Sequence, residues 1–198
     1  MATILITKAN QCENILNEID AEVLEIDSQP VDLICCKSCD LSSDLIDLML
    51  QLTEDNMKQM YEQSECGWNS KTKLKEFQHM DARFVILKLN DKLIGFCHFR
   101  FDYGSDYDDA CVYCYELQVV KEFQRQGLGK YLMNILNLLA IRFKLYKVML
   151  TVFKHNVNAM DFYVNKFKFR VDRSSPSKFG QEKDYEILSL KISKRKRL

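Results

Sequence analysis

The chain has 198 residues, with 28 lysines and arginines, 28 aspartates and glutamates, and eight cysteines. This length suits one domain with a single core, and the balanced charge excludes a global field that would drive the chain onto nucleic acid or an anionic membrane. The cysteine content is too low for a disulfide scaffold, and the sequence has neither a leader-like apolar segment nor a membrane-length apolar run. We therefore expect a reduced, soluble protein of the cytoplasm or nucleus that does not bind membranes.

The N-terminal part of the chain is expected to be helical. Apolar residues recur at helical spacing over the first 30 residues, and Pro30 would end that segment. These residues are Cys12, Ile15, Leu16 and Ile19. We assign residues 1–40 to an N-terminal helical extension, residues 41–192 to the main domain and residues 193–198 to a basic tail.

A second helix is predicted over residues 45–61, with Asp40 or Ser42 as its N-cap. Its apolar residues share one face, so that face is expected to pack against a core. They are Leu45, Leu48, Leu52, Met57 and Met60.

From residue 82 onward the pattern becomes that of a mixed sheet. Strands around 84–87 and 93–101 flank the polar turn Asn90-Asp91, which is typical of a β-hairpin. A loop is expected over 102–109, and further strands over 111–120, 146–153, 167–171 and 185–192. A long helix is expected over 128–143 and a short one over 158–166. The sequence predicts an α/β (α+β) fold in which helices flank a mixed central sheet with antiparallel strands at its start and end.

The stretch EFQRQGLGKYLM, residues 122–133, places two glycines at the start of the most apolar predicted helix. Glycine lets the backbone approach a ligand closely, so successive N–H groups and the helix N-terminus can converge on a diphosphate. Arg125 and Lys130 can add positive charge at its rim. The alternative is a glycine-rich turn that binds no ligand.

Two better-known phosphate motifs do not fit this stretch. A P-loop needs a glycine where Gln124 stands and a hydroxyl residue where Tyr131 stands. A dinucleotide fingerprint needs a third small residue at Leu132, and normally opens a domain.

The spacing Gln124-x-x-Gly127-x-Gly129 resembles the Q/R-x-x-G-x-G/A signature of the GNAT superfamily of acetyltransferases. The segment NVNAMDFYVNKFKF, residues 156–169, resembles a later motif of that family. The resemblance covers roughly residues 80–192 and implies a GNAT acyl-CoA acyltransferase fold with acetyl-CoA as cofactor. It places the pantetheine in a V between two central strands, with the Thr151 strand as one wall. The residues expected to bind acetyl-CoA are Leu117, Gln118, Val119, Gln124, Arg125, Gln126, Gly127, Leu128, Gly129, Lys130 and Asn156.

Longer strings are similar to one branch of this superfamily, the type D protein N-terminal acetyltransferases (NatD), which modify the α-amine of histones beginning Ser-Gly-Arg-Gly. The strings are YEQS (61–64), GW (67–68), HFRFD (98–102), YCYELQ (113–118), VMLTVFKHN (148–156) and SSPS (174–177). The resemblance implies histone tails as substrate, a monomeric catalytic chain without an obligatory auxiliary subunit, and a location in nucleus and cytoplasm. The chain departs from the branch at Tyr163, where phenylalanine is expected, and at Cys66, where tryptophan is expected.

The residues between 102 and 116 include several acids and no lysine or arginine. Carboxylates at the entrance of the binding site would favour a basic peptide, because they bind arginine bidentately and aromatic faces stack on its guanidinium group. The acids are Asp102, Asp106, Asp108, Asp109 and Glu116; for the loop acids a solvated loop is the alternative. The residues expected to bind the peptide are Tyr61, Trp68, Asp102, Tyr113, Tyr115, Thr151 and Ser174.

Direct acetyl transfer needs a neutral amine, and an α-amine has a reference pKa near 8, so a modest base acting through water is enough. We predict Glu116 as that base, because a carboxylate within an apolar strand needs a reason. Asp102 would assist it or anchor the amine, a backbone N–H near Leu117 would bind the developing oxyanion, and Tyr163 would protonate the leaving thiolate.

Some alternatives remain open. Two CxxC pairs, residues 36–39 and 111–114, invite a zinc site, but both lack the usual Gly or Pro knuckle, and Cys111 and Cys114, three apart on a strand, face opposite ways. We therefore expect no metal, and Cys97, Cys111 and Cys114 as small core residues. Residues 191–198 hold five basic residues and can be a nuclear signal, a contact to nucleosomal DNA or a solvated end. A GNAT enzyme acting on lysine side chains or polyamines, and a non-catalytic acetyl-CoA-binding chromatin module, are the alternative functions.

Overall fold

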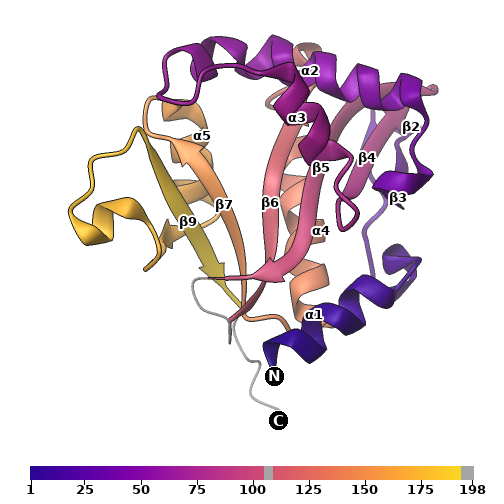
Figure 1. Cartoon of the computed structure of the whole chain (residues 1–198). Helices are drawn as coiled ribbons and strands as arrows, with labels where there is room; N and C mark the ends of the chain where they lie inside the picture. The colour runs from indigo at the N-terminus through magenta and orange to yellow at the C-terminus, as the bar shows by residue number, and fades with distance from the viewer. Residues whose placement is uncertain (105–108, 193–198) are drawn as a thin grey trace.

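The computed structural model describes residues 1–104 and 109–192. A seven-stranded sheet of order β3-β4-β5-β6-β7-β9-β8 forms its centre, with β6 and β7 parallel and the other neighbours antiparallel (Figure 1). The strands are β3 (Asp32–Lys37), β4 (Arg83–Leu89), β5 (Lys92–Tyr103), β6 (Ala110–Val119), β7 (Lys147–Phe153), β8 (Arg170–Val171) and β9 (Tyr185–Lys191). The predicted mixed sheet with antiparallel strands at both ends is confirmed.

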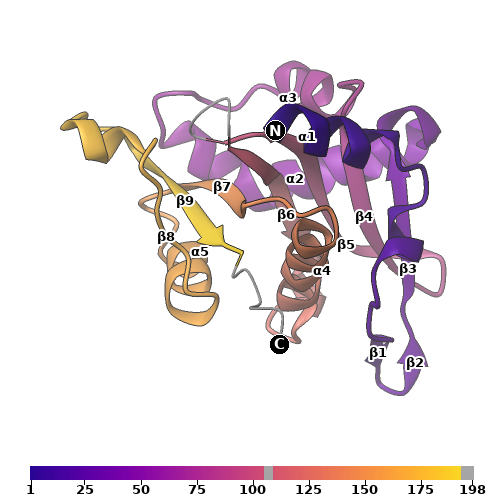
Figure 2. The same ribbon diagram turned by 90° about the horizontal axis from the view of Figure 1, so that it is seen from below.

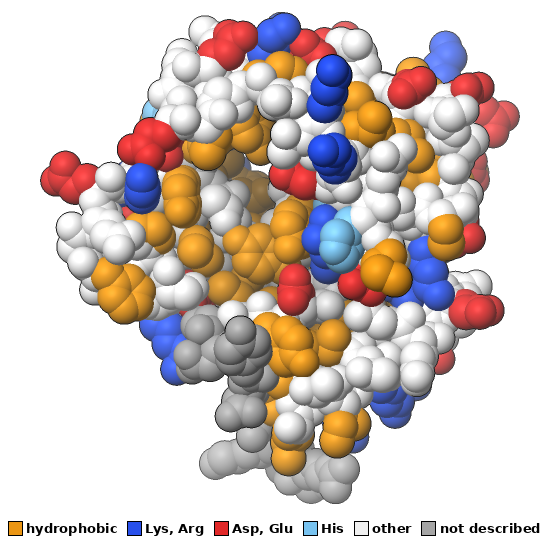
Figure 3. All heavy atoms as spheres, in the orientation of Figure 1, with side chains coloured by type: hydrophobic (Ala, Val, Ile, Leu, Met, Phe, Trp, Pro, Cys, Tyr) orange, Lys and Arg blue, Asp and Glu red, His pale blue; other side chains and the backbone are white. Residues whose placement is uncertain are grey.

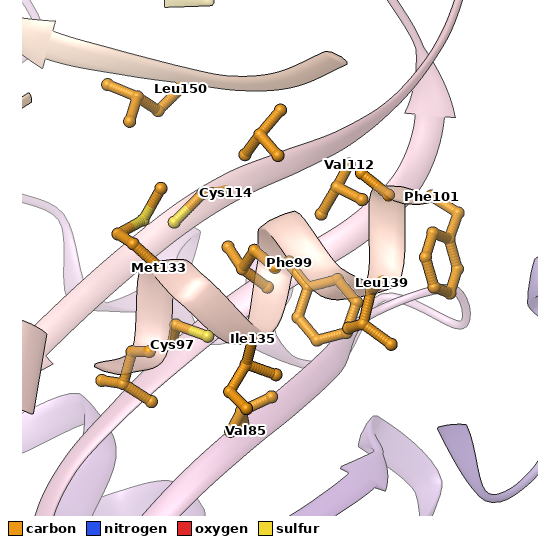
Figure 4. Packing of buried hydrophobic residues seen from close by; sticks show 14 of the residues in the cluster. Val85, Cys97, Phe99, Phe101, Val112, Cys114, Met133, Ile135, Leu139 and Leu150 are labelled. Carbon is orange, nitrogen blue, oxygen red and sulfur yellow. The ribbon is translucent and has the colours of Figure 1, made fainter. Parts of the chain in front are cut away.

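Helices cover both faces of this sheet (Figure 2). They are α1 (Ala2–Gln11), α2 (Ser43–Glu62), α3 (Ser70–Phe77), α4 (Leu128–Arg142) and α5 (Val157–Asp161). Short 3-10 turns are η1 (Ile15–Glu18), η2 (Ser38–Asp40), η3 (Lys121–Phe123) and η5 (Pro176–Phe179), and η4 (Phe162–Lys166) is a π-helical turn. α4 and α1 share one core cluster with the sheet, and α2 and α3 share a second. Figure 4 shows the first cluster, where Met133, Ile135 and Leu139 of α4 lie against Val85, Cys97 and other strand residues.

Local signals explain several of these elements. Ser42 is the N-cap of α2, because its Oγ accepts a hydrogen bond of 3.3 Å from Leu45 N, so Ser42 and not Asp40 holds this place. Asn90 and Asp91 both have positive φ, as a tight hairpin turn requires, and the predicted β4–β5 hairpin is confirmed.

The prediction of a helix over the first 30 residues is wrong beyond Gln11. Arg83, a buried residue of β4, donates hydrogen bonds of 2.8 Å and 2.7 Å to the carbonyls of Asn10 and Cys12, so a distant side chain binds the backbone where the helix ends. The chain then forms η1 and a small hairpin of β1 (Glu25–Ile26) and β2 (Gln29–Pro30). Residues 32–37 join the main sheet as β3, which the sequence did not reveal.

The elements predicted over residues 158–171 are shorter in the structure than the sequence indicated. Of the strand predicted over 167–171, only β8 pairs with β9. The helix predicted over 158–166 is α5 followed by the π-helical turn.

Candidate active site

The two parallel strands of the sheet separate partway along their length. β6 and β7 pair from Cys111↔Lys147 to Cys114↔Leu150, and beyond these residues β6 follows β5 while β7 follows β9. Figure 1 shows the two strands close together at the bottom of the view and apart at the top. The structure therefore has the predicted V, in which main-chain groups of β6 beyond residue 114 do not pair with β7.

A cavity of 510 Å³ opens at this V. Figure 3 shows the hollow in the middle of the face, with hydrophobic side chains on its walls. Its lining includes predicted site residues from four parts of the chain: Tyr61, Asp102, Tyr113, Tyr115, Glu116, Leu117, Gln118, Thr151, Asn156 and Tyr163. It also includes residues that were not predicted, which are Met57, Lys73, Glu76, Tyr103, Cys114, Leu150, Val152, Phe153 and Ala159.

A β-bulge determines how β6 presents its side chains to the cavity. His98 of β5 pairs with Glu116 and Phe99 pairs with Cys114, so Tyr115 is the extra residue. As a result Tyr115 and Glu116, although adjacent, both contact the side of the sheet that α3 covers: Tyr115 stacks on His98 at a ring-centroid distance of 5.0 Å, and Glu116 contacts Lys73. Cys114 and Leu117 pack into the α4 core.

Glu116 is held by an ion pair that sequence analysis missed. Lys73 Nζ lies 2.6 Å from Glu116 Oε1 and 2.7 Å from Glu76 Oε2. Burial alone would lower the pKa of Lys73, but the Glu116 carboxylate, with Tyr61 and Glu76, raises this pKa above its ordinary value. Glu116 is thus a buried carboxylate facing a permanent ammonium, which explains its place in an apolar strand.

The cavity also contains several hydroxyl groups that stay protonated at neutral pH. Burial, with the nearby carboxylates of Glu116 and Asp102 respectively, raises the pKa of Tyr61 and of Tyr115 to about 12. Burial first, and then nearby cysteines and Glu116, raises the pKa of Tyr163 well above its usual range. Each of these phenols can therefore donate a hydrogen bond in the cavity.

The glycine turn lies next to the V, at the N-terminus of α4. Gly127 is the N-cap and has φ +94°, a conformation that side chains with a Cβ rarely adopt, and a Cβ built on it meets no atom within 4 Å. A Cβ on Gly129 would instead lie 3.5 Å from both Leu117 Cδ2 and Phe162 Cζ. Gly127 thus leaves open space beside the helix N-terminus, which fits a diphosphate, whereas a Cβ at Gly129 would make ordinary van der Waals contacts with Leu117 and Phe162.

The other residues predicted to bind the cofactor lie around this turn. Gln124 Nε2 donates to Val119 O at 3.0 Å, and Arg125 Nη2 donates to Asn158 Oδ1 at 3.0 Å. Gln126 and Lys130 are exposed, whereas Leu128 is buried in the α4 core. Gln124 and Arg125 therefore also join the turn to β6 and α5.

Asn156 stands at the other side of the V, where its Oδ1 accepts a hydrogen bond of 3.1 Å from Ala159 N and caps α5. Trp68 does not line the cavity; it packs edge-on against Tyr61, with ring centroids 5.5 Å apart. Ser174 is also outside the cavity lining, and its hydroxyl donates to Asp172 Oδ1 at 2.8 Å.

The described acid of the loop between β5 and β6, Asp109, does not line the cavity, although the composition of the loop predicted carboxylates there. Asp109 pairs with Lys147 at 2.8 Å, away from the cavity lining, and Asp106 and Asp108 lie outside the described residues, as do residues 193–198. Glu76 takes the place of these acids, and the sequence signal that could have found it is the Lys73–Glu76 spacing of three residues on a helix.

Within residues 1–104 and 109–192, no group of three or more potential metal ligands comes together, and all eight cysteines are free thiols. Cys114 belongs to the α4 core, whereas Cys111 does not, as expected for strand residues that face opposite ways. None of the helices in this part of the chain has the length and apolarity needed to span a bilayer.

Strands that open into a V beside a glycine turn at a helix N-terminus define an acyltransferase that takes its acyl group from a coenzyme A thioester. The model of the acetyltransferase (GNAT) family matches residues 49–169, more than half of the chain. The chain belongs to this family, and it is an acetyltransferase that uses acetyl-CoA.

Solved structures of low sequence identity share the fold. Ard1 from Thermoplasma volcanium is 15% identical, with a TM-score of 0.58 over 82% of this chain and 99% of the other. NAA60 from Arabidopsis thaliana, in complex with a bisubstrate analogue, is 15% identical with a TM-score of 0.56, over 82% and 100%. The PaiA N-acetyltransferase from Thermoplasma acidophilum, in complex with coenzyme A, is 17% identical with a TM-score of 0.58, over 81% and 99%.

Proposed function

We propose that the chain acetylates protein N-terminal α-amines and that its substrates are histones beginning Ser-Gly-Arg-Gly, as in the type D branch. The observation that carries the proposal is the charge of the cavity. Its described lining holds three carboxylates, Glu76, Asp102 and Glu116, against one ammonium, Lys73. A net negative, aromatic cavity favours a cationic chain terminus followed by an arginine.

The sequence strings that resemble the type D branch support this specificity. YCYELQ supplies Tyr113, Tyr115 and Glu116 to the cavity, and VMLTVFKHN supplies Thr151 and Asn156. Tyr115 Oη donates to Asp102 Oδ2 at 3.4 Å, while the chain's own Arg100 lies over the Tyr115 ring at 4.4 Å, so the carboxylate of Asp102 is the group of this pair that we propose for the substrate arginine.

The same residues account for the chemistry. Acetyl-CoA supplies an activated acetyl thioester, held by the glycine turn and the open edge of β6. Glu116 accepts a proton from the substrate amine through water, which is sufficient because an α-amine has a reference pKa near 8. The amine nitrogen would then bond to the acetyl carbon as the carbon–sulfur bond breaks, and its second proton would pass to the sulfur, so that coenzyme A leaves as the thiol. Tyr163, which remains protonated, can donate a hydrogen bond to the departing sulfur.

The resemblance also leads us to propose the biological setting. Histone tails are the peptide substrate, the chain acts as a monomer without an obligatory auxiliary subunit, and it works in nucleus and cytoplasm. The basic residues 193–198 would serve as a nuclear signal or as a contact to nucleosomal DNA.

The test is a mass-spectrometric assay with acetyl-CoA and Ser-Gly-Arg-Gly peptides that carry an internal lysine, with the α-amine free or blocked. Acetylation of the free peptide at its terminus is expected. Equal acetylation of the blocked peptide on lysine, or faster acetylation of spermidine, would replace the proposal by the lysine or polyamine alternative.

A substitution separates catalysis from binding. Glu116→Gln should lower kcat about 10²- to 10⁴-fold, leaving a measurable residual rate, while the dissociation constant for coenzyme A, measured by calorimetry, stays within about twofold. The exposed Glu25→Gln is the matched control and should change neither. A parent protein that binds acetyl-CoA but acetylates none of the acceptors would instead be a non-catalytic module.

A further inference from the structure

Lys73 is a buried lysine in the wall of the cavity, only 6% exposed, and it belongs to none of the motifs above. It lies in the first turn of α3, whose N-cap is Asn69: the Oδ1 of that residue accepts a hydrogen bond of 3.0 Å from Thr72 N. Phe77, one helical turn later, is fully buried against the sheet. The short helix thus aims Lys73 inward over β6.

A buried ammonium is unfavourable unless it is paired and hydrogen-bonded. Lys73 Nζ contacts Glu116 at 2.6 Å, Glu76 at 2.7 Å and the Tyr61 hydroxyl at 3.1 Å. The Glu76 side chain is 34% exposed and the Glu116 side chain 5% exposed. Water screens the first pair far more than the second, so Glu116 is the partner that most strongly depends on Lys73.

The second oxygen of Glu116 is fixed as well. Gln118 Nε2 donates to Glu116 Oε2 at 2.8 Å, and Asn56 Nδ2 of α2 donates to Gln118 Oε1 at 3.0 Å. Each carboxylate oxygen therefore has one donor, and these donors come from different elements. Lys73 is the charged donor of the two.

We infer that Lys73 is a positioning residue for acetyl transfer: its ammonium fixes the Glu116 carboxylate in one orientation at the cavity. Lys73 acts through Glu116 and exchanges no proton with the substrate. The inference rests on the proposed role of Glu116 as the base. It follows that loss of Lys73 lowers the rate of transfer rather than the affinity for coenzyme A.

The experiment is a double-mutant cycle on the full chain with the variants Lys73→Met, Glu116→Gln and both together, assayed with the best acceptor of the parent protein. Lys73→Met is expected to lower kcat about 10- to 100-fold and to leave the KM for acetyl-CoA within about twofold. Lys73→Arg keeps the charge and is expected to retain kcat within about threefold of the parent. Lys75→Met, an exposed lysine of the same helix, is the matched control and should have no effect.

The double variant decides the inference. If Lys73 acts through Glu116, the double variant has the same kcat as Glu116→Gln alone, because the group that Lys73 positions is already gone. A further drop in the double variant, an unchanged kcat in Lys73→Met, or equal losses in Lys73→Arg and Lys73→Met would each overturn it.

A folding defect in a variant can be distinguished from a loss of catalysis. Removing one partner of a buried ion pair destabilises more than removing both, so the double variant is expected to be more stable than Lys73→Met. Where Lys73→Met does not fold, Lys73→Gln supplies the single-variant kcat that the cycle needs, and an unchanged kcat in that variant overturns the inference. If Glu116→Gln itself retains the parent rate, the proposed base is wrong, and that failure is distinct from a failure of Lys73.

Discussion

Tyr113 Oη and Thr151 Oγ1 lie 2.6 Å apart and join β6 to β7 just where the two strands separate. This bond crosses the V between the predicted peptide-binding residues, so it sets the width of the cavity at that level. Thr151→Val keeps the side-chain shape and removes the bond. We expect the KM for the peptide to rise about 3- to 10-fold, the equivalent of one hydrogen bond, with coenzyme A affinity unchanged.

Steady-state kinetics with the peptide varied checks this expectation. Tyr113→Phe removes the same bond from the other side and should have the same effect, and the two changes together should cost no more than either alone. Independent, multiplying effects would mean that each hydroxyl contacts the peptide separately.

His98 is fully buried between Phe84 and Tyr115, at ring-centroid distances of 5.0 Å from each. Neither ring nitrogen has a hydrogen-bond partner among residues 1–104 and 109–192. Burial, with the charges of Arg100 and Lys73, lowers the pKa of His98 well below its usual value near 6.5. The folded protein therefore holds this histidine neutral, while the unfolded chain takes up a proton as the pH falls.

Stability linked to His98 is thus present at neutral pH and lost below about pH 6.5, by up to about 1.4 kcal/mol per pH unit. His98→Phe removes this proton linkage, so its free energy of unfolding should fall about 1 to 2 kcal/mol less than that of the parent between pH 7 and pH 5. Urea denaturation over this pH range measures the difference, and the exposed His79→Gln serves as control. An unchanged slope in His98→Phe would show that the buried ring already carries a proton.

The two glycines of the turn are expected to respond differently to alanine. Gly127 has φ +94°, so Gly127→Ala should lower the free energy of unfolding by about 1 to 3 kcal/mol and weaken coenzyme A binding at least about tenfold. Gly129 lies inside α4, and an added Cβ makes only van der Waals contacts with Leu117 and Phe162. Gly129→Ala should therefore change stability by less than about 1 kcal/mol.

Denaturation and calorimetry with coenzyme A give both quantities for each variant. The opposite order, with Gly129→Ala the more damaging, would mean that the ligand approaches the backbone at the second glycine.

The parts of the fold that depend on local chemistry could be predicted from the sequence. The Asn90-Asp91 turn needs two residues that tolerate positive φ, and the glycine turn needs Gly127 for the same reason, so both follow from the residues themselves. The long helix α4 and the strands around it follow from strong apolar patterns. The V between β6 and β7 came from the resemblance carried by the turn.

The parts that depend on distant partners could not be predicted. α1 ends where the Arg83 side chain binds its carbonyls, a contact between residues more than 70 positions apart. α3 is eight residues long, too short for a clear apolar period, and the pairing of Lys73 with Glu116 requires both the helix position and the bulge at Tyr115. The pairing that accounts for the Glu116 carboxylate in β6 could therefore not be predicted from sequence patterns.

The last prediction concerns Lys147, which is buried between two carboxylates. Its Nζ lies 2.8 Å from Asp109 Oδ2 and 2.9 Å from Asp172 Oδ2, and all three side chains are at most 16% exposed. This cluster joins the segment after β5 to the segment after β8, at the end of β7 opposite the cavity. It is therefore expected to support the fold without contributing to the chemistry.

Lys147→Met would leave the buried Asp172 and the half-buried Asp109 without their shared cation, with Arg173 still 3.5 Å from Asp109, and should lower the free energy of unfolding by about 3 to 5 kcal/mol. Lys92→Met, at an exposed lysine, is the control and should change it by less than about 0.5 kcal/mol. Urea denaturation compares the two, and kcat at a temperature where both variants are folded should stay within about twofold of the parent. A large loss of kcat in folded Lys147→Met would mean that this ion cluster contributes to the active site.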